Sequence, residues 1–76
     1  MSDLVRKRSV QIAGHATSVS LEEAFWQELT SIAERRGLSL NALVAEVDGA
    51  RTGNLSSALR LLVLQDLQER LSSTGL

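Results

Sequence analysis

The sequence predicts a mainly α-helical fold with a short N-terminal β-strand, in which two copies of the chain intertwine as an obligate homodimer. Apolar residues alternate with polar ones between residues 8 and 20, as in a β-strand, and then recur at helical spacing in three later segments. The third helical segment is too apolar for a chain of 76 residues to cover by itself. Because the sequence contains no cysteine, a partner chain is expected to supply the stability that disulfides give other small domains.

Charge is unevenly distributed along the chain. The net charge of the whole chain is −1, which argues against unspecific binding to nucleic acid. Residues 1–7 are expected to form a flexible basic arm. The basic cluster at this end consists of Arg6, Lys7 and Arg8. Dimerisation would double the cluster, and its side chains are candidates for contacts with the DNA backbone. A solubilising tail is the alternative interpretation.

Residues 8–20 form the strand region. Val10 and Ile12 occupy even positions, whereas Thr17 and Val19 occupy odd positions. The inward face must therefore switch near Gly14, where a bulge or a turn would produce the switch. One long kinked strand and two short strands both fit this pattern.

A first helix is predicted over residues 21–36. Ser20 and Glu23 have the spacing of a capping box, in which each side chain accepts a hydrogen bond from the other residue's backbone amide. Gly37 is expected to end the helix in a left-handed conformation. The expected core face consists of Phe25, Leu29, Ile32 and Ala33. Trp26 cannot share a face with Phe25, so it is expected to pack on the partner chain or on the third helix.

Two further helices are predicted, over residues 39–49 and 55–71. Ser39 begins the second helix and is a candidate to cap it. The apolar stripe of this helix is Leu40, Leu43, Val44 and Val47. Asn54 or Ser56 is expected to cap the third helix. Its apolar positions are Leu55, Ala58, Leu59, Leu61, Leu62, Val63, Leu64, Leu67 and Leu71. These positions cover much more than a stripe of about 100°, so burial on two sides is expected, and this is the main argument for a dimer.

Residues 16–50 resemble the ribbon-helix-helix (MetJ/Arc) family. The most specific part is Arg36-Gly37-Leu38-Ser39-Leu40-Asn41-Ala42-Leu43, which is similar to the family's turn between its two helices. The wider stretch from Lys7 to Arg60 is similar to a bacterial subfamily of small, mostly uncharacterised proteins, here with a third C-terminal helix. The resemblance implies that strands of two chains pair into an antiparallel two-stranded ribbon, which enters the major groove of double-stranded DNA.

The resemblance also implies site residues. The base-facing positions are Ala16, Ser18 and Ser20, with His15 as a further contact. The phosphate-binding amides would come from Ser39, Leu40 and Asn41, at the start of the second helix. Thr17 and Val19 would point into the core. Ala16 and Ser18 are shorter than the residues that better-known members carry there, which puts strong sequence-specific readout in doubt. In an alternative register the ribbon is residues 8–12, and Gln11 reads an adenine.

No enzymatic activity, metal site or cofactor is predicted. His15 is the only histidine, cysteine is absent, and no glycine-rich phosphate loop occurs. The longest apolar run, residues 61–64, is too short for a membrane span, and no signal peptide is recognisable, so a cytoplasmic location is expected. The predicted function is a homodimeric DNA-binding transcriptional regulator, acting as a dimer or as a tetramer on DNA. The alternative is a protein-interaction module or antitoxin-like dimer that binds a partner protein through its C-terminal helix.

Overall fold

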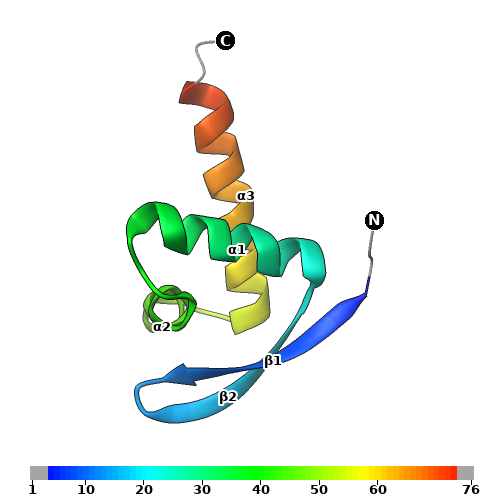
Figure 1. Ribbon diagram of the computed structural model, residues 1–76, viewed down its shortest axis with the longest axis vertical. Coiled ribbons are helices and arrows are strands. Elements are labelled where there is room, and N and C mark those ends of the chain that lie inside the picture. The colour runs from blue at the N-terminus through cyan, green and yellow to red at the C-terminus, as the bar shows by residue number, and fades with distance from the viewer. Residues whose placement is uncertain (1–3, 74–76) are drawn as a thin grey trace.

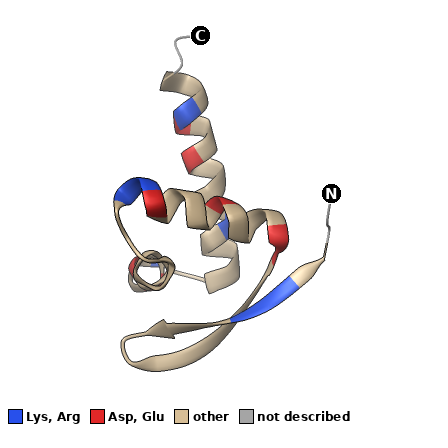
Figure 2. Cartoon of the chain, viewed as in Figure 1, with Lys and Arg blue, Asp and Glu red and all other residues tan. Residues whose placement is uncertain are grey.

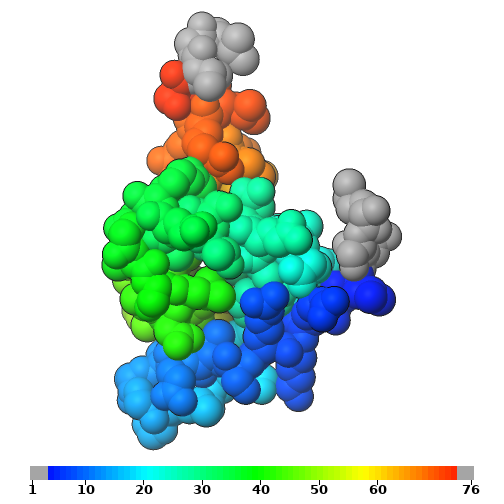
Figure 3. Space-filling view, in the orientation of Figure 1, coloured from blue at the N-terminus to red at the C-terminus, as the bar shows by residue number. Residues whose placement is uncertain are grey.

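The chain folds into a hairpin with three helices stacked on one of its faces (Figure 1). The computed structural model describes residues 4–73. The elements are β1 (Val5–Ile12), β2 (His15–Glu22), α1 (Glu23–Arg36), α2 (Leu40–Ala50) and α3 (Leu55–Ser73). The last turns of α3 project beyond the rest of the molecule (Figure 3). The predicted fold class, mainly α-helical with an N-terminal β region and a third helix, is confirmed.

The two strands pair antiparallel within a single chain. Ala13 and Gly14 connect them with φ angles of 51° and 83°, the left-handed values that a two-residue hairpin turn requires. This turn switches the inward face, as the pattern around Gly14 predicted, and the structure has two short strands. The resemblance predicts a ribbon across a dimer, whereas the observed ribbon lies within one chain. Strand pairing between two chains stays a prediction.

The start of α1 differs from the prediction. Strand β2 continues through Ser20 to Glu22, which occupies the N-cap without a side-chain hydrogen bond to the helix. The capping box expected at Ser20 is therefore wrong, because pairing with β1 extends the strand past this local signal. Glu23 instead forms ion pairs with Arg6 at 3.0 Å and Arg8 at 3.6 Å. Residues 5–7, expected in a flexible arm, belong to β1, and residues 1–3 lie outside the described residues.

The other helix ends follow the local signals in the sequence. Gly37 has a φ of 71° and ends α1 in the left-handed conformation. The Ser39 hydroxyl accepts a hydrogen bond from the amide of Ala42 at 3.0 Å and caps α2. The Asn54 side chain accepts one from the amide of Ser57 at 3.1 Å at the start of α3. These three signals are confirmed.

The core lies between the hairpin and the helices. Its buried side chains are Val10, Val19, Leu21, Trp26, Leu29, Ile32, Ala33, Leu43, Val44, Leu59 and Val63. Trp26, expected on a partner chain or on the third helix, is 1% exposed in the core of its own chain, whereas Phe25 is only half-buried. This correction follows from β1, which covers the Trp26 side of α1. Thr17, expected to point inward, is exposed.

Helix α3 is buried on one side only. Leu59 and Val63 reach the core, and ion pairs join the charged side chains of α3 to α1 and β2. Figure 2 shows where charged residues lie along these elements. The exposed leucines are Leu61, Leu64, Leu67 and Leu71. The second buried side that the sequence predicted is therefore open in a single chain. No helix within residues 4–73 combines the length and apolar content needed to cross a membrane.

Candidate nucleic-acid interface

The helices leave one face of the hairpin uncovered (Figure 1). Side chains alternate between the two faces of a strand, and the buried Val10 and Val19 mark the face toward the helices. Seven residues on the opposite face are exposed: Val5, Lys7, Ser9, Gln11, Ala16, Ser18 and Ser20. The last six are called here the open face. Their cross-strand pairs are Lys7 with Ser20, Ser9 with Ser18, and Gln11 with Ala16. Ser18 and Gln11, which belong to the two alternative registers predicted from the sequence, thus lie on one surface.

The open face carries a positive charge and no carboxylate. Lys7 is its charged residue and forms no ion pair within residues 4–73. Figure 2 shows basic residues along β1, while the remainder of the hairpin is without acidic residues up to the end of β2. There, the carboxylate of Glu22 is bound by Arg60 at 2.9 Å. This surface suits a polyanion, which an acidic patch would repel.

The basic cluster is divided between the two faces of β1. Arg6 and Arg8 alternate with Lys7 and lie on the face toward the helices. There Arg6 pairs with Glu23, and the Arg8 guanidinium lies 5.2 Å from the centre of the Trp26 ring. Of the three basic residues expected to contact the DNA backbone, the structure therefore places only Lys7 on the open face.

His15 lies away from the other base-facing candidates. By strand alternation it belongs to the face of Thr17 and Val19. It lines a groove of about 430 Å³ between β2 and the connection from α2 to α3, where Arg51 and Asn54 form part of the opposite wall. The structure therefore does not bring His15 to the open face, whereas Ser20, which the expected capping box would have occupied, is exposed there.

The start of α2 lies beside the open face. The side-chain oxygen of Asn41 accepts a hydrogen bond from the backbone amide of Gln11 at 3.3 Å, which holds the first turn of α2 against β1. The Ser39 hydroxyl accepts a hydrogen bond from the backbone amide of Ala42. The backbone amides of Leu40 and Asn41 have no hydrogen-bond partner within residues 4–73. Free amides at a helix N-terminus attract anions. The three residues predicted to bind phosphate are therefore adjacent to the predicted ribbon.

Sequence reasoning missed that both strands contribute to one surface. The signal was present, because two alternating runs separated by the two residues Ala13 and Gly14 are typical of a hairpin. The contact between Asn41 and Gln11 joins residues 30 positions apart and has no local signal.

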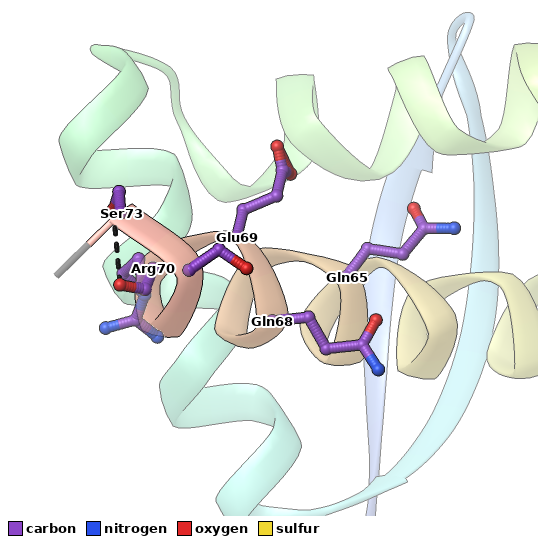
Figure 4. Close-up of a pocket in the computed structure, with 6 residues that line it drawn as sticks. Gln65, Gln68, Glu69, Arg70 and Ser73 are labelled. Carbon is purple, nitrogen blue, oxygen red and sulfur yellow. Dashed lines mark hydrogen bonds between the residues drawn. The ribbon is translucent and has the colours of Figure 1, made fainter. Parts of the chain in front are cut away.

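The end of α3 is a weaker candidate for a binding site. A hollow near the end of α3 is lined by Gln65, Gln68, Glu69, Arg70, Ser72 and Ser73 (Figure 4). All six come from one helix, and Ser73 donates a hydrogen bond to the Arg70 carbonyl at 3.2 Å, so no second wall provides converging groups. Within residues 4–73, no group of three or more His, Asp or Glu residues is placed to hold a metal ion.

The chain matches the family model of a ribbon-helix-helix domain over residues 5–67. Among solved structures it is similar to an uncharacterized protein from Bordetella pertussis Tohama I, with 35% sequence identity and a TM-score of 0.73. This similarity covers 91% of the chain and 62% of the other protein, so the chain spans less than two thirds of that protein's length. No curated protein matches the chain.

Proposed function

The chain belongs to the ribbon-helix-helix family, and from this we propose that it is a homodimeric DNA-binding protein that regulates transcription in the bacterial cytoplasm. The family is one of DNA-binding proteins that typically dimerise, without an enzymatic activity. The observation that carries the proposal for this chain is the open face, which is polar, lacks carboxylates and lies beside the free amides of α2.

The open face offers groups suited to the major groove, which is about 12 Å wide and admits a β-ribbon. The hydroxyls of Ser18 and Ser20 both donate and accept hydrogen bonds, and the side-chain amide of Gln11 can do the same toward base edges. Lys7 and the first amides of α2 are the groups for the phosphates, which carry no sequence information. Short serines discriminate weakly between bases, so we expect a modest ratio of specific to unspecific affinity.

Selection of DNA duplexes from a randomised pool, at two salt concentrations, tests this function. We expect enrichment of a short palindrome, because a two-fold symmetric dimer reads two equal half-sites. Affinity should fall steeply as salt rises, since each phosphate contact releases a counterion. A pool that stays unenriched at the lower salt concentration would contradict the proposal.

A second candidate function is binding of a partner protein through α3. The observation that favours it is the exposure of Leu61, Leu64 and Leu67, at 56%, 49% and 37%, on a helix that projects from the molecule. Contiguous exposed leucines are typical of interaction surfaces. Mass in solution and hydrogen exchange test this candidate. A homodimer in which these turns of α3 are protected would leave no surface there for another protein.

A further inference from the structure

The side of α3 that faces away from the core carries a regularly spaced stripe, called here the α3 stripe: Ser57, Leu61, Leu64 and Gln68. Its central members, Leu61 and Leu64, are 56% and 49% exposed. Ser57 and Gln68 are also exposed, and the four positions follow one another at intervals of four, three and four residues. This spacing is typical of the a and d positions of a coiled coil, which lie against a second helix. The stripe therefore has the form of a helix-packing surface.

Three of the four charged side chains of α3 form ion pairs within their own chain. Arg60 pairs with Glu22 of β2 at 2.9 Å, and Arg70 pairs with Glu28 of α1 at 3.2 Å. Asp66 pairs with arginines of α1 and α3. Along one side the α3 stripe is flanked by uncharged residues, Ala58, Gln65 and Ser72. Charges at such flanking positions select a partner of complementary charge. The stripe and this flank offer none, so an identical helix meets no repulsion there.

A groove lies beside the α3 stripe, between α2 and the first half of α3. Its volume is about 420 Å³, and its apolar lining consists of Val47, Ala50, Ala58, Leu61 and Leu62. The last turns of α3 project beyond the rest of the molecule at the other end of the helix (Figure 3). A helix packed antiparallel on the stripe would bring its own projecting turns to this groove, whereas a parallel helix would leave the groove uncovered.

The area of the α3 stripe indicates what kind of contact it forms. One face of this 19-residue helix is about 28 Å long and about 10 Å wide. This is less than the roughly 800 Å² that each partner buries in a stable interface. The stripe and the groove therefore suit an additional contact between chains that already assemble elsewhere. A homodimer always supplies further copies of the same helix.

We infer that α3 packs antiparallel against α3 of a second copy of the chain, with Leu61 opposite Leu64 of the copy and Ser57 opposite Gln68 of the copy. In this register the stripe is complementary to itself, because leucine meets leucine and polar side chains meet each other. Each of these pairs occurs twice, since a two-fold axis relates the copies. The projecting turns of each copy then lie over the groove of the other.

The position of the hairpin decides which chains meet through α3. The hairpin lies at one end of the molecule, and the projecting turns of α3 lie at the other (Figure 1). Antiparallel packing inverts the second copy, so the two hairpins lie at opposite ends of the pair and their open faces point apart. Two hairpins that read one DNA site must instead lie side by side. The α3 contact therefore joins chains of two different homodimers, a step that rests on the homodimer of the proposed function.

Cysteine cross-linking tests the register without DNA. The chain has no cysteine, and Ser57 and Gln68 are exposed. In the double variant Ser57→Cys/Gln68→Cys, each thiol faces the other kind of thiol in the copy, with about 5 Å between the Cα atoms of packed helices. Mild oxidation should therefore link two chains. A disulfide within one chain is excluded, because about three helical turns, or about 16 Å, separate the two sites.

Three controls make the cross-link specific. Ser57→Cys alone and Gln68→Cys alone should stay unlinked, because antiparallel packing keeps identical positions far apart. Ser57→Cys/Glu69→Cys should also stay unlinked, since Glu69 is exposed but turned about 100° around the helix from Gln68. No linkage in the first double variant, or equal linkage in a control, would overturn the inference. Linkage of the single variants would indicate parallel helices.

Leu64→Gln provides a second measurement. Because Leu64 is half exposed in the single chain, the variant should keep its fold, which circular dichroism checks. The mass of the wild type, measured over a range of concentrations, should reach four chains. The Kd of this association should rise roughly 30-fold in Leu64→Gln, because the leucine is lost at both of its contacts in the pair. Glu69→Gln, the control beside the stripe, should leave the Kd nearly unchanged. Equal association of Leu64→Gln and wild type would overturn the inference.

The results separate this inference from the proposed function. A double variant that links, in a protein that enriches no DNA sequence, would keep the α3 pair and remove the DNA-binding role. A protein that selects a palindrome but does not link would keep the role and overturn the pair. A linked protein that never exceeds two chains would keep the pair and contradict the homodimer of the proposed function. Absence of both linkage and four-chain assembly would overturn the pair and leave the exposed leucines to another protein.

Discussion

The indole N–H of Trp26 donates a hydrogen bond to the backbone carbonyl of Arg6 at 3.0 Å. This bond joins α1 to β1. Trp26 is 1% exposed, and the guanidinium of Arg8 lies over its ring. A buried indole needs a partner for its N–H, and β1 supplies it. The first strand is therefore part of the core and fixes the position of the hairpin relative to α1.

Replacing Trp26 with Phe should lower the free energy of unfolding by about 2 kcal/mol, because the substitution removes the hydrogen bond and leaves part of the indole volume empty. Urea unfolding followed by far-UV circular dichroism measures the change. Gln27→Ala, at the exposed neighbouring position, is the control and should shift the free energy by less than about 0.5 kcal/mol. A Trp26→Phe effect as small as that of the control would show that β1 is not anchored through the indole.

Lys7 and Arg6 are neighbours on opposite faces of β1, and this predicts different effects on DNA binding. Lys7→Gln should weaken binding to all sequences and lower the slope of log affinity against log salt by about two per dimer, one for each chain. Arg6→Gln should leave the slope nearly unchanged, since Arg6 is paired with Glu23 on the other face. Titrations of one duplex at several salt concentrations measure both. A larger slope change for Arg6→Gln would contradict the assignment of the open face.

Features with local causes were predictable from the sequence. The left-handed stop at Gly37 and the caps at Ser39 and Asn54 depend on residues within four positions of each other, and all three formed as expected. The capping box at Ser20 failed although its spacing was correct. Pairing of β2 with β1 competes with the cap, and the ladder of hydrogen bonds extends the strand to Glu22.

The sequence suggested individual candidates for the site but not the surface that some of them share, and Arg6, Arg8 and His15 lie outside the open face. Ser18 and Gln11 were both identified, as members of alternative registers, and the hairpin turn places them on one face. Whether Phe25 or Trp26 is buried depends on where β1 lies against α1. The helical periodicity of α1 gives no information about the position of β1. The excess of leucine on α3 correctly indicated apolar surface that the single chain leaves open.

Alanine substitutions at two glycines should have effects of opposite sign. A methyl group at either Gly37 or Gly49 would meet no atom within 4 Å, so only the backbone conformation decides. Gly37 has a φ of 71°, and Gly37→Ala should lower the free energy of unfolding by about 1 kcal/mol. Gly49 lies within α2, and Gly49→Ala should raise the free energy of unfolding by about 0.5–1 kcal/mol. Urea unfolding of both variants measures the difference, and effects of the same sign would refute it.

The ion pairs of α3 should make the stability of the protein fall in acid. The hydrogen bond from Arg35, assisted by Arg70, lowers the pKa of Asp66. The hydrogen bond from its own backbone amide, assisted by Arg60, lowers the pKa of Glu22. A carboxylate whose pKa is lower in the folded state contributes stability above its unfolded pKa, which is about 4 for both residue types. This contribution is lost as the pH falls from about 4 through the folded pKa.

Asp66→Asn tests the ion pairs that Asp66 forms with two arginines. Asp66 accepts hydrogen bonds from Arg35 at 2.9 Å and from Arg70 at 3.0 Å. At pH 7 the substitution should lower the free energy of unfolding by about 0.5–1 kcal/mol, the range for ion pairs near a protein surface. As the pH falls from about 4 through the lowered pKa of Asp66, the wild type loses the same contribution by protonation, so the difference between the two proteins should shrink. Glu69→Gln is the control, since Glu69 forms no ion pair within residues 4–73. A difference between Asp66→Asn and wild type that stays constant as the pH falls from 7 until the wild type unfolds would show that the carboxylate stabilises α3 by packing and not by its charge.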